Sequence, residues 1–566
     1  MQILHLSRPE EDGAFYCSAS LIAGLLAILQ LAILSESCFA QYSVTDLASA
    51  SLVNGGVGDS ASSGAACLSA DGRVVVYFTN ATDMVPGEMS SSGQLVAKDL
   101  ATGLAEVVSV SDQGVPGNGV SFGPRCSADG RYVVFVSTAT NLASNDTDAT
   151  ADVFLRDRSL GTTTCLSTGA APPHNAVGGN SPDISRDGRF VVFSSHSSQI
   201  DLNYPFMPFR NIFLHDREQD TTRLVSSTHL DGVSNNTSSS PRVSGDGSTI
   251  SFLSRASNLV PGDTNMRSDV FVRELGTWQI ERISVDSNGN QASLPFVDTL
   301  YNHAELSVDG QLVSFEYRAP DMIVGEHHPG QNVYLRDRQA GTLELINLNS
   351  QDELAMHPVY AGADDGNEGG ISDDGRYVLF WSTGANLSPP SAEGWRVPYV
   401  RDRVAGITRP VALSSNGVPA NAGSDPWAMS ADGRFVVFSS QADNLTPNDD
   451  NLATDVFVRD MLTGGPELVV SNAVAGQAAQ LSVSGCTPST VVFVAASLTG
   501  QGVLPSYWGP LELSGPLVLL PFASDGTGTV NASVPLPPSF AGLPLWVQGL
   551  DLGMNYPTSI WAGTVQ

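Results

Sequence analysis

A short apolar run that follows a polar turn recurs along the chain. Each copy has the pattern S-x-D-G-R-x-V-V-F, as in SADGRVVVYF from Ser69 and SRDGRFVVFS from Ser185. Successive β-branched and aromatic residues indicate a strand, and an Asp-Gly pair between apolar runs predicts a two-residue hairpin turn. The turn aspartates of the seven copies lie 58 to 65 residues apart and are Asp71, Asp129, Asp187, Asp246, Asp309, Asp374 and Asp432.

Each repeat carries patterns for further strands. A V-F-x-R-D run follows the first motif, as in DVFLRDRSLG from Asp152, and a T-x-x-L-V-S run comes next, as in TTRLVSS from Thr221. With the strand before the Asp-Gly turn, this makes four strands per repeat, and no segment keeps the apolar period of a helix. Four-stranded units in series build a β-propeller, which closes its sheet edges in a ring. We therefore expect an all-β fold with a seven-bladed β-propeller.

The sequence leaves the closure of the ring open. The segment VTDLASAS from Val44 looks like a fourth strand ahead of the first repeat, and it would seal the ring with a strand from the opposite end of the chain. The segment PELVVSN from Pro466 is a second candidate for the same position. A partial eighth blade built from LSVSGC at Leu481 also remains possible, so an eight-bladed ring is the alternative.

The repeat resembles a known type of unit. The S-x-D-G-R-x-V-V-F motif with its trailing V-F-x-R-D strand is similar to the WD-repeat-like units of TolB-type bacterial propellers, over about 430 residues from Val44 to Asn472. The resemblance implies the propeller fold. It implies little about activity, since that superfamily includes protein-binding scaffolds, peptidase propellers and lyases. The repeats here are longer than those of TolB, and the α/β N-terminal domain of TolB has no counterpart.

The two ends of the chain differ from the repeats. Residues 21–34, LIAGLLAILQLAIL, carry no charge but are too few to span a bilayer, so we expect residues 1–40 to be a signal peptide cleaved after Ala40. The propeller would then occupy residues 41–474. Residues 475–566 alternate short apolar runs with Pro/Gly turns, which predicts a small C-terminal β module. That module resembles one that ends secreted proteins of planctomycete-like bacteria.

Export follows from the leader. We expect a periplasmic, cell-surface or extracellular protein with no transmembrane segment in the mature chain, since no later apolar run reaches 18 residues. Four cysteines remain in that chain, Cys67, Cys126, Cys165 and Cys486, and none forms a CxxC pair. Cys126 takes a position where other repeats carry Val or Ile, which indicates a buried free thiol, although an oxidising compartment also permits disulfides.

The charge balance excludes one class of partner. The chain has 27 Lys+Arg against 58 Asp+Glu, a formal net charge of −31, yet only 15% of its residues are charged. Lys98 is the one lysine. Binding to nucleic acid needs clustered cations, so we expect no nucleic-acid partner.

Three of the loops that precede the V-F-x-R-D strand carry carboxylate or amide groups at positions 1, 3 and 7. Oxygen ligands at alternate positions of a compact loop are what calcium requires. The competing interpretation is that these side chains satisfy backbone N–H groups of turns. The candidate calcium ligands are Asp146, Asp148 and Asp152; Asp263, Asn265 and Asp269; and Asp449, Asn451 and Asp455.

Other chemical-looking residues have structural interpretations. The Arg-Asp pair of the third strand recurs in nearly every repeat, whereas an active site is unique, so we expect structural contacts from Arg156/Asp157, Arg273/Glu274, Arg336/Asp337, Arg401/Asp402 and Arg459/Asp460. The segment Gly119–Gly123 matches G-x-S-x-G, but Ser121 lies in a connection between repeats and not in an α/β-hydrolase sheet. Four histidines in repeats five and six could converge on a metal: His303, His327, His328 and His357.

Three functional hypotheses follow. The first is an exported, non-enzymatic propeller that binds a protein or glycan through loops on one face of the ring, with no catalytic residue and no cofactor other than possible calcium. The second is a lyase-like enzyme acting on an extracellular glycan, with a metal site in the loops of repeats five and six. The third is a calcium-stabilised surface or adhesive protein.

Overall fold

The computed structural model describes residues 45–461 apart from short gaps, the longest being 292–303, 325–331, 356–369 and 388–394, and the backbone of the strands between Glu467 and Thr564. The chain divides into two compact units. One is Ser43–Gly464, and the other contains Gly465–Gln566. All regular structure in the described residues is β-strand, and no described helix is long and apolar enough to cross a membrane. The predicted leader, residues 1–40, lies outside the described residues.

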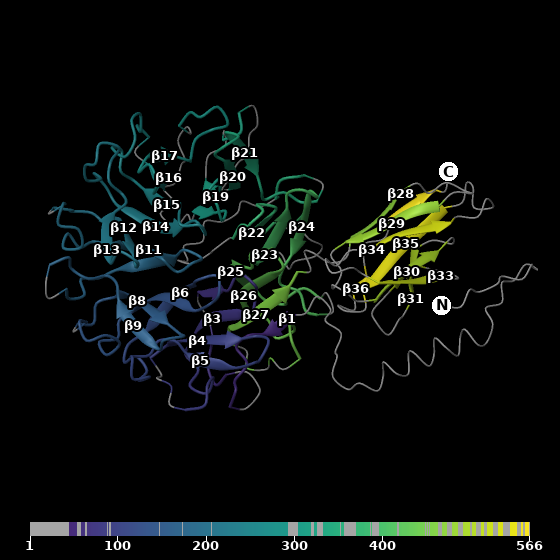
Figure 1. Cartoon of the computed structure of the whole chain (residues 1–566), viewed down its shortest axis with the longest axis horizontal. Helices are drawn as coiled ribbons and strands as arrows, with labels where there is room; N and C mark the ends of the chain where they lie inside the picture. Colours follow the sequence, from purple (N-terminus) through teal and green to yellow (C-terminus); the bar gives the residue numbers. More distant parts are fainter. Residues whose placement is uncertain are drawn as a thin grey trace, which may run out of the picture. The chain divides into compact units, whose positions relative to one another are not determined.

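The first unit is a ring of seven antiparallel sheets, which confirms the predicted seven-bladed β-propeller (Figure 1). Blades 1 to 4 consist of β2 (Ala66–Leu68), β3 (Val74–Thr79), β4 (Gln94–Asp99) and β5 (Ala105–Val107); β6 (Ser121–Cys126), β7 (Tyr132–Ser137), β8 (Asp152–Asp157) and β9 (Thr162–Cys165); β10 (Asn180–Ile184), β11 (Phe190–Ser195), β12 (Asn211–Asp216) and β13 (Thr221–Leu224); and β14 (Ser238–Val243), β15 (Thr249–Ser254), β16 (Asp269–Glu274) and β17 (Ile280–Arg282).

Blades 5 to 7 repeat this order. They consist of β18 (Ala304–Leu306), β19 (Leu312–Tyr317), β20 (Asn332–Asp337) and β21 (Thr342–Leu345); β22 (Tyr377–Ser382), β23 (Val397–Asp402) and β24 (Ile407–Pro410); and β25 (Ser424–Met429), β26 (Phe435–Ser440), β27 (Asp455–Asp460) and β1 (Thr45–Leu47). In blade 6 the innermost position holds a single bridge, Ile371 to Val378, in place of a strand.

The second and third strands of each blade are buried on both faces because each blade packs between two neighbours. This explains why V-V-F is a continuous apolar run and not an alternating one. One core cluster combines Val76 and Leu95 of blade 1 with Val133 and Phe154 of blade 2. Within a blade the paired phenylalanines stack, as in Phe135 on Phe154 with ring centroids 5.8 Å apart.

The Ser-x-Asp-Gly turn is longer than the predicted two-residue turn. In blade 1, Ser69 N–H donates to the Val74 carbonyl at 2.8 Å, so four residues form the loop. The Ser69 hydroxyl donates to Asp71 Oδ1 at 2.6 Å and accepts from Val74 N–H at 2.8 Å. Gly72 alone takes positive φ, +74°. The Ser and Asp side chains replace backbone bonds that a two-residue turn would make, which is why they recur with the glycine.

These turns also set the order of the blades. A Cβ on each turn glycine would come within 3.0 Å of the residue that opens the second strand of the preceding blade. The contacts run around the whole ring: Gly72 to Phe435, Gly130 to Val74, Gly188 to Tyr132, Gly247 to Phe190, Gly310 to Thr249, Gly375 to Leu312 and Gly433 to Tyr377. Backbone bonds follow the same path, and Ala431 N–H donates to the Ala70 carbonyl at 2.9 Å, across the junction of blades 7 and 1.

The ring closes with the N-terminal strand. Strand β1 pairs with β27 antiparallel, with Asp46 opposite Val458, and so completes blade 7. The competing segment forms β28 (Glu467–Ser471), which pairs with β29 (Ala478–Ser484) in the second unit, so residues 465–474 lie with that unit and not with the propeller. The candidate for an eighth blade, Leu481–Ser484, lies within β29, so the ring has seven blades.

The second unit is built from strands only, in its described backbone. Its three sheets have the orders β28-β29-β34, β33-β30-β35-β36 with β37 beside β35, and β31-β32. The remaining strands are β30 (Val491–Ser497), β31 (Gln501–Leu504), β32 (Leu511–Leu513), β33 (Val518–Ala523), β34 (Val530–Pro535), β35 (Pro544–Asp551), β36 (Tyr556–Pro557) and β37 (Trp561–Thr564).

Candidate functional site

Antiparallel order gives the propeller two distinct faces. The turns between strands one and two, and between strands three and four, lie at one end of every blade, which we call the turn face. The loops between strands two and three, and the connections between blades, lie at the other end, the loop face. The three candidate calcium loops and the connection at 108–120 therefore share the loop face.

The turn face is bridged at its centre. The Arg186 guanidinium of blade 3 forms a bidentate ion pair with the Asp373 carboxylate of blade 6. Blades 4 and 5 lie between these two blades in the ring, so the ion pair must cross the central opening. Gly245 of blade 4 is packed against this bridge, since a Cβ there would lie 2.7 Å from Arg186 Cδ and 2.6 Å from Val308 Cγ2. Access to the centre is thus narrowed from the turn face.

Charged side chains line the innermost strands, and the sequence analysis did not single them out. Arg125 Nε lies 3.5 Å from Asp183 Oδ1, and Arg242 Nε donates to Glu305 Oε1 at 2.9 Å. Burial raises the pKa of Asp183, while Arg125 and Arg242 oppose that rise. Three of these residues, Arg125, Asp183 and Arg242, each come directly after a β-bulge, where the register of the innermost strand shifts. In the sequence, a small residue and a proline precede each of these three charged residues, in the triplets G-P-R, S-P-D and S-P-R. This pattern could have pointed to them.

The structure brings the blade 2 carboxylates together at the end of the loop before β8. One oxygen from each of Asp146, Asp148 and Asp152 lies within 4.8 Å of the other two, and this is the one such acidic group found in the part of the chain that the structure describes. Asp146 is 2% exposed and Asp152 is 0% exposed, whereas Asp148 is exposed.

The hydrogen bonds of these three carboxylates differ. Asp152 accepts from the Ser167 hydroxyl at 2.7 Å, from Gly178 N–H at 2.8 Å and from the Thr150 hydroxyl at 3.1 Å. Asp146 Oδ1 accepts a weak bond from Asp148 N–H at 3.3 Å, and Asp146 Oδ2 is buried with no hydrogen-bond partner in the structure. Burial raises the pKa of Asp146 to about 6, and Asp152 and Asp148 add to the rise by charge repulsion.

In blade 4 the equivalent loop lies beside a cation, Arg282 of β17. Asp263 Oδ1 lies 3.6 Å from Arg282 Nη1 and accepts from Gln291 Nε2 at 3.0 Å. Asp269 accepts from the Ser284 hydroxyl at 2.5 Å, and Asn265 Nδ2 donates to Asp269 Oδ2 at 3.2 Å. Burial raises the pKa of Asp263, which the Gln291 and Arg282 contacts partly reverse.

In blade 7 the third residue of the candidate calcium pattern, Asp455, forms a structural hydrogen bond. Asp455 Oδ1 accepts from the Ser49 hydroxyl at 2.6 Å, and Ser49 Oγ accepts from Val456 N–H at 3.0 Å. The same arrangement joins Asp152 to Ser167 in blade 2 and Asn211 to Ser226 in blade 3. The third residue of the predicted calcium pattern therefore fastens strand three to strand four, whether it is Asp or Asn.

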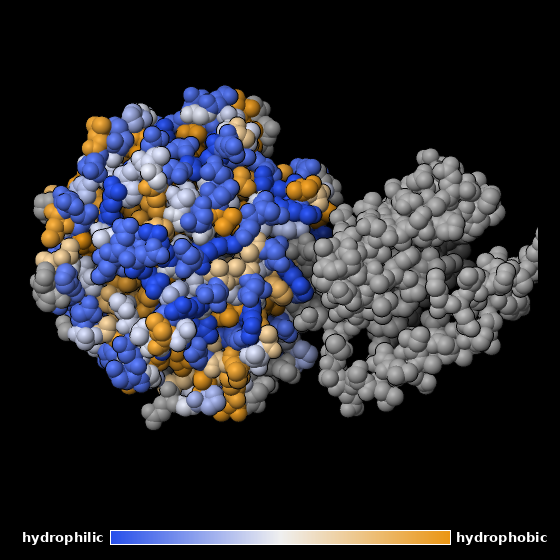
Figure 2. Space-filling view, in the orientation of Figure 1, coloured by the Kyte–Doolittle hydropathy of each residue, from blue (hydrophilic) through white to orange (hydrophobic). Residues whose placement is uncertain are grey.

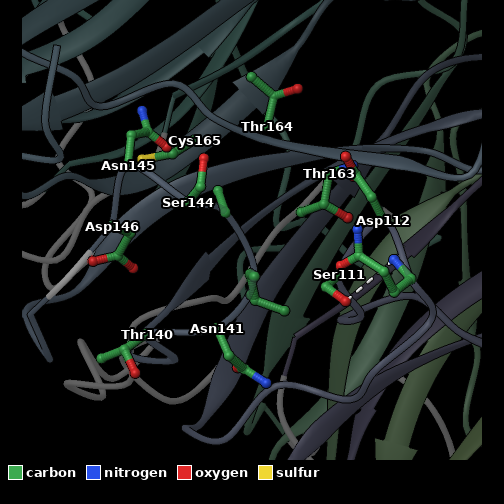
Figure 3. A pocket seen from close by; sticks show the side chains of 13 residues that line it. Ser111, Asp112, Thr140, Asn141, Ser144, Asn145, Asp146, Thr163, Thr164 and Cys165 are labelled. Carbon is green, nitrogen blue, oxygen red and sulfur yellow. Dashed lines mark hydrogen bonds between the residues drawn. The ribbon is translucent and has the colours of Figure 1, made fainter. Parts of the chain in front are cut away.

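A pocket opens beside the blade 2 carboxylates (Figure 3). Its walls come from the connection between blades 1 and 2, the blade 2 loop and β9. In the close view, Asp146 and Asn145 lie on one side of the pocket, and Ser111 and Asp112 lie on the other. The lining is mainly hydroxyl, amide and carboxylate groups: Ser111, Asp112, Gln113, Thr140, Asn141, Ser144, Asn145, Asp146, Thr163 and Thr164, with Leu142, Ala143 and Cys165.

The recurring Arg-Asp pairs are structural, as predicted. Asp157 receives a bidentate ion pair from Arg131 of the same blade, with Nη2 2.7 Å from Oδ2. Arg156 reaches the preceding connection and donates to the Ser111 carbonyl at 3.3 Å, and Arg401 donates likewise to the Asn349 carbonyl at 2.9 Å. In these examples the arginine joins neighbouring blades, and Asp157 joins two strands of one blade.

The other sequence candidates are also placed where the structure describes them. Ser121 is fully buried at the start of β6, and its hydroxyl donates to Ser137 Oγ at 2.9 Å, which is no nucleophile elbow. Cys126 and Cys165 are free thiols, Cys67 is buried, and Cys126 is half-buried where a buried side chain was predicted. Cys486 and the four histidines, His303, His327, His328 and His357, lie outside the described residues.

Comparisons with known proteins assign the chain to no family. No protein-family profile matches the chain, and a comparison with curated proteins gave no match. The chain is similar to a TolB-type structure from Agrobacterium tumefaciens, with 18% identity over 50% of this chain and 79% of that one at a TM-score of 0.30. It is also similar to a Pseudomonas aeruginosa periplasmic gluconolactonase, with 14% identity over 61% and 83% at a TM-score of 0.30.

A third similar structure is that of the RRP9 WD40 repeats, with 8% identity over 75% of this chain and 99% of that one at a TM-score of 0.37. Likenesses at this level carry no argument about activity. The class of protein is therefore defined by the chain's own strand pairing, as a seven-bladed β-propeller.

Proposed function

We propose that the chain is an exported, non-enzymatic propeller that binds a glycan at the loop face, in the pocket between blades 1 and 2. The observation that carries this proposal is the lining of that pocket, in which hydroxyl and amide groups converge from separate elements. Asn141 and Asn145 come from the blade 2 loop, Ser111 and Gln113 from the connection, and Thr164 from β9. Groups of this kind form hydrogen bonds to the hydroxyls of a sugar.

Charge narrows the choice of ligand. Asp112 and Asp146 lie in the same pocket, and none of the described residues that line it is Lys or Arg. A neutral or amino-bearing glycan therefore fits better than a sulfated or uronic-acid glycan. The side of the propeller that is seen in Figure 2 is mostly hydrophilic, with scattered apolar residues.

The test is a glycan array and a peptide array probed with the purified protein, followed by calorimetry on any hit. We expect Gln113→Ala and Asn141→Ala each to weaken binding by about tenfold, roughly 1.4 kcal/mol. If the protein binds a peptide and binds no glycan, its partner is a protein and the proposed glycan binding is wrong. Turnover of an arrayed polysaccharide would contradict the non-enzymatic function.

The chain offers a matched control for Asn141. Its Nδ2 donates to the Pro116 carbonyl at 3.0 Å, and Asn258 Nδ2 of blade 4 donates in the same way to the Val233 carbonyl at 3.0 Å. Asn258→Ala removes the same structural bond outside the pocket, so it should lower stability equally and leave binding unchanged. Equal loss of binding in both variants would mean that the pocket is not the site.

A further inference from the structure

We infer that Asp146, Asp148 and Asp152 of blade 2 form a calcium site. The corresponding loop of blade 4 binds no metal, because the side chains of Arg282 and Gln291 already contact its first carboxylate, Asp263. The inference does not rest on the proposed glycan binding, because calcium binding is measured without a glycan, although Asp146 lies in the wall of the same pocket.

The geometry of the three carboxylates suits one cation. Calcium lies 2.3–2.6 Å from its oxygen ligands, so two oxygens on one ion are at most about 5 Å apart. The three carboxylate oxygens lie within 4.8 Å of one another. An all-oxygen set selects a hard cation, and backbone carbonyls and water from the open pocket would complete a shell of six to eight ligands.

The second observation is the buried Asp146 carboxylate. It is 2% exposed, its Oδ2 has no hydrogen-bond partner in the structure, and it belongs to the group of converging oxygens. Burying a charged oxygen without a partner is costly, and natural structures pair such groups or coordinate them to metals. A bound cation would satisfy this oxygen and relieve the repulsion from Asp148 and Asp152.

Internal comparison explains why blade 2 differs from blade 4. Strand register places Cys165 opposite Phe154 in blade 2, and Arg282 opposite Phe271 in blade 4, so these two residues are equivalent. The isolated bridges that follow make Ala176 equivalent to Gln291. Blade 4 therefore holds its first aspartate with a guanidinium and an amide, and blade 2 has a thiol and a methyl group at those positions.

Cys165 does not supply the positive charge that Arg282 supplies in blade 4, because a thiol is neutral and a thiolate is an anion. Its buried sulfur is also a soft donor, whereas calcium takes oxygen ligands. Blade 7 also differs from blade 2, because Asn451 replaces the middle aspartate and the loop carries one charge fewer.

The test is calorimetric titration of the metal-free purified protein with calcium chloride. We expect one calcium bound per chain, with a thermal midpoint that rises on adding calcium and falls with chelator, since a ligand of the folded state raises its stability. Asp148→Asn should weaken calcium binding at least tenfold. Asp148 is exposed, so this variant should fold normally. Asp146→Asn should weaken binding at least as much.

Two variants separate this site from the blade 4 loop. Asp263→Asn is the matched control and should leave calcium affinity unchanged. Cys165→Arg places the blade 4 cation in blade 2 and should abolish calcium binding while the midpoint becomes insensitive to chelator. Failure of the unsubstituted protein to bind calcium, or equal losses in Asp148→Asn and Asp263→Asn, would overturn the inference.

Discussion

Gly72 of blade 1 packs against Phe435 of blade 7. A larger side chain at position 72 should weaken the junction between these two blades. Substitution Gly72→Ala adds one Cβ to a residue whose φ is +74°. That Cβ would lie within 3.0 Å of Cδ2, Cγ and Cβ of Phe435. The change therefore combines a strained backbone with overpacking between blades.

The size of each effect can be assigned separately. A left-handed backbone at a non-glycine residue costs about 1–2 kcal/mol, and overpacking adds about 1–3 kcal/mol. Gly103→Ala is the matched control, because Gly103 has φ +71° in another turn of blade 1 and nothing lies within 4 Å of its added Cβ. We expect Gly72→Ala to lower the free energy of unfolding by about 2–5 kcal/mol and Gly103→Ala by about 1–2 kcal/mol.

Urea denaturation followed by far-UV circular dichroism measures both variants. The difference between them isolates the interblade contact. A double variant, Gly72→Ala with Phe435→Val, should recover part of the loss, because valine opens this strand in blade 1 and packs there against Gly130. If Gly72→Ala and Gly103→Ala cost the same, or if the double variant recovers nothing, the turn glycines do not hold the blades together.

Three further outcomes follow from individual contacts. The Arg131 ion pair lowers the pKa of Asp157, so its stabilisation is present above about pH 4 and is lost as the pH falls through the lowered pKa. Arg131→Gln should therefore be less stable than the unsubstituted protein at pH 7, and the difference should disappear once the pH is below that lowered pKa, as measured by urea denaturation at each pH. Ser49→Ala removes the hydroxyl that bonds Asp455 at 2.6 Å and should cost about 1–3 kcal/mol; an unchanged midpoint would mean that the N-terminal strand does not close blade 7. The buried Cys165 thiol should resist a thiol reagent until the protein unfolds, and rapid labelling under native conditions would contradict its burial.

Local patterns were sufficient for the architecture of each blade. The S-x-D-G-R-x-V-V-F motif and the V-F-x-R-D run predicted the second and third strands because burial on both sides demands a continuous apolar run. The turn was predicted at the right place but with too few residues, since the Ser69 and Asp71 side chains take over backbone bonds. The order of apolar and polar residues does not reveal that side chains replace backbone hydrogen bonds in this turn.

The candidate site was only partly predictable. The spacing of Asp146, Asp148 and Asp152 pointed to a loop whose carboxylates converge in the structure, but the same spacing also pointed to Asp263 and Asp449. What separates blade 2 from blade 4 is the residue across the strand, Cys165 or Arg282, and this pairing depends on register. Cys165 follows Asp146 by 19 positions, and Arg282 follows Asp263 by 19 positions, so inspection of the loop alone does not reveal the residue that distinguishes the two blades.

The sequence by itself determined the number of repeats, the strands within each and the structural role of the Arg-Asp pairs, because these depend on local periodicity and on turn chemistry repeated seven times. Only the tertiary structure decided the closure of the ring. The segments at Thr45 and Glu467 have similar local patterns, and the choice between them depends on contacts more than 400 residues apart in sequence, such as Ser49 with Asp455. The bridge from Arg186 to Asp373 has the same origin, since ring geometry alone brings blades 3 and 6 to a common centre.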